Sequence, residues 1–155
     1  MRFTTLLMAF ILAAPFFAGC GANSNPFGTV YLEGVVTVDG QPMQGISVSL
    51  LPRNGDLAAG GITDDKGKFT VETGGAPVGS GAKPGEYDIV FRKSRTEGAN
   101  MSMEETTALY GPGELPMTYL IPQRYSSPAT SGIAPITVSD KKAENKFKFE
   151  LTSEE

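Results

Sequence analysis

The sequence predicts an all-β protein, an antiparallel seven-stranded β-sandwich that follows an N-terminal signal peptide. Three observations predict this fold class. Apolar and polar residues alternate over several short runs, which is the period of half-buried strands. Turn-forming residues separate the runs, and the 155 residues include 19 Gly and 11 Pro. No long run has a helical period, so helices are not expected as main elements.

Four strands are predicted in the first half of the chain. The first covers residues 30–38 and ends in a hairpin turn at Asp39–Gly40. The next two cover 46–50 and 58–63, and the fourth continues through 69–71 after an acidic turn. Alternation assigns the following residues to the core: Val30, Leu32, Gly34, Val36, Val38, Ile46, Val48, Leu50, Phe69 and Val71.

Three more strands are predicted in the second half. They cover residues 87–91, 133–138 and 147–151, and the last two are joined by a turn over 140–145. Pro135 lies inside the sixth strand and has no N–H, so that strand is expected at a sheet edge or a bulge. The expected core residues are Tyr87, Ile89, Phe91, Ile133, Ile136, Val138, Phe147, Phe149 and Leu151.

The N-terminus carries an export signal. Arg2 precedes an apolar run over residues 6–14, which has the length of a signal peptide and is too short to span a membrane. The following Phe17-Ala18-Gly19-Cys20 resembles the lipobox of bacterial lipoproteins. The resemblance implies cleavage before Cys20 and attachment of lipid to its thiol. An ordinary secretory signal followed by a free thiol is the alternative.

The expected domain plan follows from this signal. Residues 1–19 form the signal peptide, residues 20–28 the lipidated Cys20 with a flexible tether, and residues 29–152 the β-sandwich. Two or three acyl chains, at about 0.8 kcal/mol per buried methylene, would anchor the chain to a membrane almost permanently. Gly21 follows Cys20 in place of an Asp, which predicts a cell-envelope location on the outer membrane, facing the periplasm or the outside.

Composition excludes several classes of function. The chain has 17 acidic and 13 basic residues and a pI near 4.9, so no nucleic-acid partner is expected. It has no His, which removes His-based catalysis and most zinc or iron sites. A single Cys excludes an internal disulfide. We therefore expect no catalytic residues, no cofactor and no metal.

One connection is much longer than a hairpin loop. It runs over residues 94–128, and its residues 101–109 could form one or two helical turns. Tyr and Arg often supply most of the energy of an interface. The candidate binding surface is therefore Tyr110, Tyr119, Arg124 and Tyr125. An equally physical alternative is that Ile121 and Tyr125 only pin this loop onto the sandwich.

Two patterns that resemble chemical sites have simpler explanations. Asp39, Asp64 and Asp65 could suggest calcium, but they lack the ligand spacing of a calcium loop and fit tight turns. Ser139 and Lys142 have the spacing of a serine nucleophile with a lysine base. That arrangement needs the Ser at a helix start, whereas this pair lies at the end of a predicted strand. We expect no catalysis from either pattern.

Several segments resemble carboxypeptidase regulatory-like, or transthyretin-like, domains. The opening Leu32–Val48, the Gly61–Phe69 hairpin and Lys83-Pro84-Gly85-Glu86-Tyr87 match motifs of that family. Ile121-Pro122-Gln123-Arg124-Tyr125 and Thr130-Ser131-Gly132 resemble a lipoprotein subgroup abundant in planctomycete bacteria. These motifs consist of turn and core residues, so they indicate a fold and say little about activity.

The resemblance covers about residues 29–151 and implies a transthyretin/prealbumin-like sandwich with an Ig-like Greek key. Some relatives hydrolyse a purine-derived ring with histidines, and this chain has none. The expected function is a non-enzymatic, envelope-anchored lipoprotein whose sandwich mediates protein interaction or structural support. A glycan- or peptide-binding module at the cell surface is the alternative, with the partner an envelope protein or a glycan. A hydrolase with paired carboxylates has no spacing signal in its favour.

Overall fold

The structure is a computed structural model that describes residues 26–113 and 115–154, and it confirms the all-β prediction. This part of the chain forms eleven short strands, two α-helices and two 3-10 helices. The predicted signal peptide, Cys20 and most of the predicted tether lie outside the described residues. No helix within the described residues is long and apolar enough to cross a membrane.

The first sheet is built around β1 (Glu33–Val38). On one side β1 pairs with β11 (Lys146–Leu151), and on the other side it pairs with β2 (Gln41–Pro42) and β5 (Lys68–Thr70). The β1–β11 pair is parallel, so the prediction of a wholly antiparallel arrangement is wrong at this pair. Parallel strands need a long connection, and nearly the whole domain lies between these two strands.

The second sheet is antiparallel throughout and has the order β10-β7-β3-β4-β6. The strands are β3 (Ser47–Pro52), β4 (Ala59–Ile62), β6 (Glu72–Thr73), β7 (Gly85–Arg92) and β10 (Ile136–Val138). Strand β10 lies at the edge of the sheet, as predicted, but it begins only after Pro135, so the prediction of a strand over 133–138 with Pro135 inside it is wrong. The predicted number of seven strands is not confirmed, because the short strands β2, β6, β8 and β9 were not predicted.

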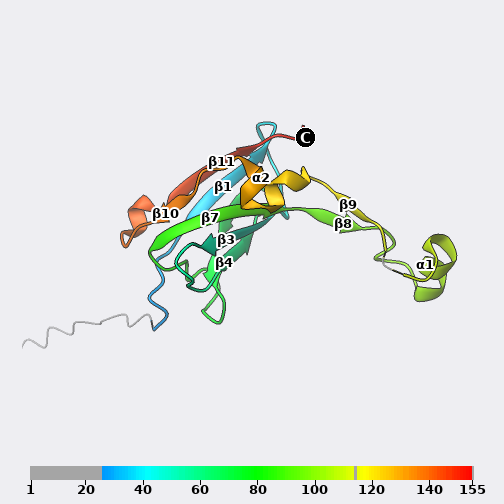
Figure 1. Cartoon of the computed structure of the whole chain (residues 1–155), viewed down its shortest axis with the longest axis horizontal. Helices are drawn as coiled ribbons and strands as arrows, with labels where there is room; N and C mark the ends of the chain where they lie inside the picture. The colour runs from blue at the N-terminus through cyan, green and yellow to red at the C-terminus, as the bar shows by residue number, and fades with distance from the viewer. Residues whose placement is uncertain (1–25, 114, 155) are drawn as a thin grey trace, which may run out of the picture.

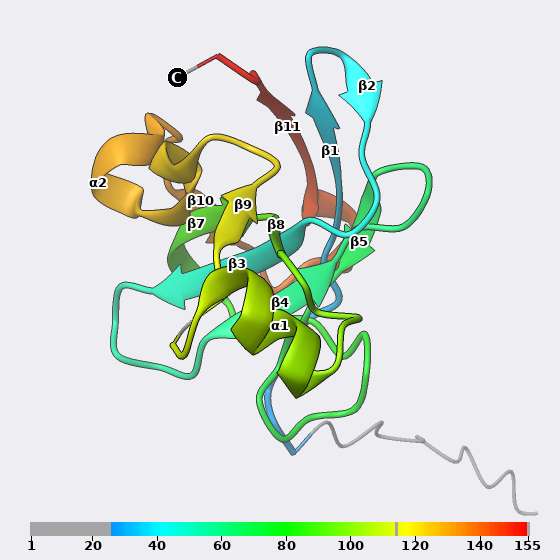
Figure 2. The same cartoon turned by 90° about the vertical axis from the view of Figure 1, so that its right-hand side faces the viewer.

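The core lies between these two sheets. The ring of Phe149 on β11 is 6.3 Å from that of Phe69 in its own sheet and 5.1 Å from that of Phe91 on β7 in the other. Figures 1 and 2 show the two sheets side by side, with β1 and β11 above β7 and β3. Of the predicted core residues, only Val30, Ile133 and Phe147 are half-buried, and the rest are buried. The alternation of the sequence therefore predicted the core correctly.

The predicted Asp39–Gly40 turn is also confirmed. It joins β1 to β2, with φ values of 51° at Asp39 and 77° at Gly40. Two successive residues in this left-handed region form the turn type that fits the twist of a hairpin, and Gly is the residue that adopts it at least cost. The turn thereby directs the chain back along β1.

An arm projects from this two-sheet body. It consists of β8 (Ser94–Thr96), helix α1 (Met103–Tyr110) and β9 (Met117–Tyr119), and Figure 1 shows it extending from the end of β7 away from both sheets. The chain returns to the body through η1 (Gln123–Ser126) and α2 (Pro128–Ser131). A last 3-10 turn, η2 (Lys142–Glu144), connects β10 to β11.

Candidate functional site

The arm is the candidate site, and its stalk is a two-stranded ribbon. Strands β8 and β9 pair antiparallel in the register Ser94↔Tyr119, Arg95↔Thr118 and Thr96↔Met117. The Glu97 carboxylate accepts hydrogen bonds from Thr118 at 2.8 Å and from Arg95 at 3.3 Å. These contacts tie the two strands together without any apolar core, because all six paired residues are exposed.

Helix α1 forms at the end of this ribbon because its first turn is capped from both sides. The Ser102 hydroxyl accepts a hydrogen bond from the Glu105 backbone N–H, and the Glu105 carboxylate accepts one from the Ser102 backbone N–H. This reciprocal capping box satisfies two donors at the helix start. The hydrogen bonds from Ser102 also lower the pKa of Glu105. The predicted helical turns at 101–109 are thereby confirmed, with a shift of one or two residues.

The arm exposes apolar side chains that a monomer normally buries. No residue of α1 is buried, and Met103 and Leu109 are 85% and 62% exposed. Other large apolar residues exposed on the arm are Met101, Tyr110, Met117, Tyr119 and Leu120. Exposed apolar residues scattered singly are ordinary, but their number on this one projecting element favours a contact surface, and Met101, Ala108 and Leu109 lie together on it.

The tip of the arm is acidic as well as apolar. Residues 97–113 include three Glu and neither Lys nor Arg. Glu104 and Glu105 lie in the first turn of α1, where the positive end of the helix dipole favours a negative charge. Glu105 is occupied by the capping box, whereas Glu104 has no hydrogen bond or ion pair within the described residues. A partner of this tip would therefore combine apolar and basic groups.

Two buried side chains fasten the base of the arm to the body. Ile121 and Tyr125 are 4% and 5% exposed and belong to the main core. The Leu120 backbone N–H donates to the Lys93 carbonyl at 2.8 Å, so the ribbon ends where the chain meets the body. The arm is consequently held at its base and free along its length.

The Tyr125 hydroxyl is held by the residue after the last strand. It accepts a hydrogen bond from the Thr152 backbone N–H at 3.0 Å and one from Arg124 at 2.9 Å. Burial alone would raise the pKa of Tyr125, but the hydrogen bonds from Thr152 and Arg124 outweigh it and bring that pKa below its ordinary value. The Arg124 guanidinium also lies 4.7 Å from the centre of the Tyr125 ring.

The four residues of the predicted binding surface are therefore not one surface. Tyr110 lies at the tip of the arm, where a Cβ at Gly98 would lie 3.1 Å from an atom of its ring. Tyr119 lies on the stalk and is exposed. Tyr125 does not belong to an exposed surface, because its ring lies in the core, as the alternative interpretation of this loop expected, and Arg124 donates a hydrogen bond to its hydroxyl.

A second feature is a hollow of about 700 Å³ over β1, β5 and β11, on the body of the molecule. Its floor includes Val35, which pairs with Lys148 on one side and Lys68 on the other. Ile62 and Tyr31 also line it. Because side chains alternate along strands, Val35, Lys68 and Lys148 share the outer face of the sheet.

The hollow has a positive balance, since three lysines and two acids line it. Glu33 is paired with Lys146 at 3.1 Å, and this contact, followed by the hydrogen bond from Tyr31, lowers the pKa of Glu33. The Asp64 carboxylate accepts backbone N–H groups of Lys66 and Lys68. Neither the Lys68 nor the Lys148 ammonium has an ion-pair partner among the residues that the structure describes.

The acidic residues that could suggest calcium lie in turns. The Asp64 carboxylate closes the turn before β5, where it accepts the backbone N–H groups of Lys66 at 2.9 Å and of Lys68 at 2.8 Å. The Asp39 carboxylate accepts the Ser153 backbone N–H at 3.1 Å. No group of three or more possible metal ligands occurs within 26–113 and 115–154. The turn interpretation of these residues therefore agrees with their contacts.

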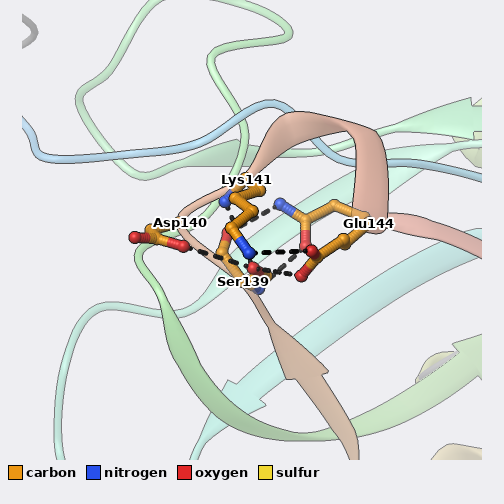
Figure 3. A network of polar contacts seen from close by, with 5 residues as sticks. Ser139, Asp140, Lys141 and Glu144 are labelled. Carbon is orange, nitrogen blue, oxygen red and sulfur yellow. Dashed lines mark hydrogen bonds and ion pairs between the residues drawn. The ribbon is translucent and has the colours of Figure 1, made fainter.

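Ser139 lies in a polar network at the turn between β10 and β11, which Figure 3 shows from close by. Its hydroxyl donates to Glu144 at 2.7 Å and accepts the Lys141 backbone N–H at 3.2 Å. Lys142, the base of the predicted pattern, instead lies 4.4 Å from the centre of the Tyr31 ring. The contacts of Ser139 therefore hold the turn, and the Lys142 ammonium lies over the Tyr31 ring and not beside Ser139.

Sequence reasoning missed one residue at this turn and most of the hollow. Asn145 is fully buried, and its carboxamide bonds to the N–H and C=O of Ser139 at 2.8 Å and 2.9 Å. It was treated only as part of a turn. The hollow residues Lys68 and Lys148 could have been found as outward positions of alternating strands, but nothing in the sequence shows which strands are neighbours.

Comparison with known proteins gives no relative of this chain. No protein-family model, no curated protein and no solved structure matches it.

Proposed function

We propose that this chain is a non-enzymatic lipoprotein of the bacterial cell envelope, anchored through lipid on Cys20, that makes protein contacts through the arm of β8, α1 and β9. The arm is the observation that carries this proposal. It extends from the body, its apolar side chains are exposed, and its base is fixed by buried Ile121 and Tyr125. An element with its own capped helix and no core of its own is best explained by a partner that covers it.

We extend this proposal to the type of fold. The two facing sheets are taken as a β-sandwich of the carboxypeptidase regulatory-like, transthyretin-like type, with a Greek-key order. Support comes from the motifs at the opening strand and the acidic hairpin, which coincide with β1 to β3 and with the turn before β5. In this description the sandwich is the rigid base, and the long connection carries the function.

The anchor is tested by changing Cys20→Ser in the full-length protein. Detergent phase separation should place the wild-type protein in the detergent phase and the Cys20→Ser variant in the aqueous phase, because the acyl chains provide the membrane affinity. Cleavage before residue 20 should be visible in the intact mass of the wild-type protein. If both proteins partition equally into detergent, the anchor is not on this thiol.

The arm is tested by cross-linking the full-length protein in its native membranes and identifying partners by mass spectrometry. A double variant, Met103→Glu with Leu109→Glu, should lose the recurrent protein cross-links by about tenfold, because charged groups would have to be buried in the contact. The matched control is Leu57→Glu with Val78→Glu, which changes two exposed apolar residues of the body. Cross-links that survive in the arm variant, or recovery only with a glycan fraction, would contradict the proposal.

A further inference from the structure

We propose that the partner of the arm is a second copy of this chain, and that helix α1 of one copy docks into the hollow over β1, β5 and β11 of the next. This inference rests on the proposed function of the arm and adds the identity of the partner and its docking site. Two unpartnered features of one molecule complement each other in charge and in chemistry. Neither feature has another occupant within the described residues.

The charges are opposite on the two surfaces. Of the three Glu of the tip, residues 97–113, Glu97 is paired with Arg95 and Glu105 with the helix cap, which leaves the charge of Glu104 unpaired within the described residues. The hollow has Lys68 and Lys148, which have no ion-pair partners in the same part of the chain. The two lysines flank Val35 on neighbouring strands, so their backbones lie roughly 10 Å apart, at two strand spacings. A carboxylate above Val35, such as that of Glu104, is within reach of both flexible side chains.

The apolar parts also match. A shallow surface on the arm is made of Ala108 and Leu109 of α1 and of Met101, which precedes the N-cap Ser102. Glu105 lies beside them. The hollow offers Val35, which lies between Lys68 and Lys148, and its lining also includes Ile62 and Phe147. Covering these groups removes apolar surface from water on both partners, while the lysines and glutamates at the margin fix the orientation.

The contact must form between copies. Figure 1 shows α1 far from β1 and β11 of the same molecule, and the arm base is fixed by Ile121 and Tyr125. The donor surface and the acceptor surface are different patches, so the interface is heterologous. Each copy can give one arm and accept one, which generates a closed ring or an open row of molecules along the membrane. A lipid bilayer is a less suitable occupant, because acidic tips are repelled by anionic headgroups.

The test places a photo-activated cross-linking amino acid at Leu109 of the full-length protein in its native membranes. We expect a species of twice the monomer mass, in which residue 109 is joined to residues 33–35, 68–70 or 146–148 of another copy. The variant Lys68→Glu with Lys148→Glu should reduce this species about tenfold or more, since like charges would face each other. The control is Lys66→Glu, which reverses the charge of a lysine outside the lining of the hollow. This variant should leave the amount of the cross-linked species unchanged.

Charge reversal supplies a second arm of the test. Glu104→Lys should also reduce the cross-linked species, and a mixture of Glu104→Lys protein with the double lysine variant should restore a dimer. In that mixture the acidic arm of the lysine variant meets the unchanged hollow of the Glu104→Lys protein. This recovery separates a direct contact from a general effect of either change on folding.

The outcomes distinguish this inference from the proposed function. Cross-links from residue 109 to a different protein would overturn the self-association and leave the arm as a contact element. Cross-links to lipid, or none, would overturn both. A cross-link within one copy, or to a surface of the second copy other than the hollow, would overturn the docking site.

Discussion

Tyr125 and Thr152 are joined by a hydrogen bond across 27 positions of sequence, with the Thr152 backbone N–H donating to the Tyr125 hydroxyl at 3.0 Å. The bond connects the base of the arm to the end of β11, the last strand. The Tyr125 ring lies in the core, and its hydroxyl also accepts a hydrogen bond from the Arg124 guanidinium. The base of the arm is therefore attached to the same sheet that carries the hollow.

Removing only this hydroxyl should weaken the attachment measurably. Tyr125→Phe keeps the buried ring but leaves the Thr152 N–H without its acceptor and removes one of the two hydrogen bonds of Arg124, whose guanidinium still donates to the Thr152 hydroxyl at 2.6 Å. We expect a loss of about 1–2 kcal/mol in the free energy of unfolding, measured by urea denaturation. Tyr119→Phe is the control, because that hydroxyl is exposed and should change stability by less than about 0.5 kcal/mol. Equal stabilities of the two variants would show that the hydroxyl does not fasten the arm.

Close packing at Gly34 gives a second prediction. A Cβ at this position of β1 would lie 2.6 Å from two atoms of the Phe69 ring. Gly34→Ala should therefore displace that ring and cost about 1–3 kcal/mol of stability. Gly74→Ala is the matched control, since a Cβ there meets nothing within 4 Å and its φ is not positive. A thermal unfolding midpoint that is unchanged by Gly34→Ala would contradict the packing described here.

The buried carboxamide of Asn145 gives a third prediction. Asn145→Ala removes the partners of the Ser139 N–H and C=O and a longer contact to the Tyr31 carbonyl at 3.4 Å. Each group left without a hydrogen-bond partner costs its desolvation penalty, so we expect a loss of about 2–3 kcal/mol in the free energy of unfolding. Asn100→Ala, on the exposed arm, serves as the control. If the two changes had equal effects in denaturant, Asn145 would not hold the turn.

The capping box predicts how the arm responds to pH. Hydrogen bonds from Ser102 lower the pKa of Glu105 in the helix, so the folded helix prefers the charged carboxylate. Its stabilisation of α1 is complete above the unfolded pKa, near 4.3, and is lost as the pH falls through the lower, folded value. Hydrogen exchange of the α1 amides should therefore accelerate below about pH 4, beyond the intrinsic trend.

Glu105→Gln is the control for this prediction. The amide oxygen can still accept the Ser102 N–H, but the side chain no longer titrates, so the acceleration in acid should be smaller. Amides of β7 in the body should stay protected over the same range in both proteins. An identical pH profile for wild type and Glu105→Gln would assign the acid effect to other carboxylates.

The sequence predicted the core because burial and alternation are local properties of each strand. The Asp39–Gly40 turn lies as expected, the predicted run 147–151 corresponds to β11, and the predicted run 30–38 corresponds to β1, which begins at Glu33. Alternation does not state which strands are neighbours, so the parallel pairing of β1 with β11 was missed. The β8–β9 ribbon was missed as well, because its residues are exposed on both faces and carry no period.

The candidate site was predictable in part. The length of the 94–128 connection led to the choice of this segment as the candidate site, and the helix within it was expected. Residue type alone could not separate Tyr110 and Tyr119, which are exposed, from Tyr125, which is buried. That distinction depends on the Thr152 N–H and on the space between the sheets, and both are properties of the folded chain.

The central claim is that a partner covers the arm in the cell. It is tested most directly by measuring how fast a membrane-permeant maleimide labels the thiol of a Leu109→Cys variant in native membranes and in the purified, detergent-diluted protein. We predict that labelling in membranes is about tenfold slower or more, while a Val78→Cys variant on the body reacts equally fast in both. Equal labelling of Leu109→Cys in the two preparations would mean that nothing covers the arm, and it would contradict the account.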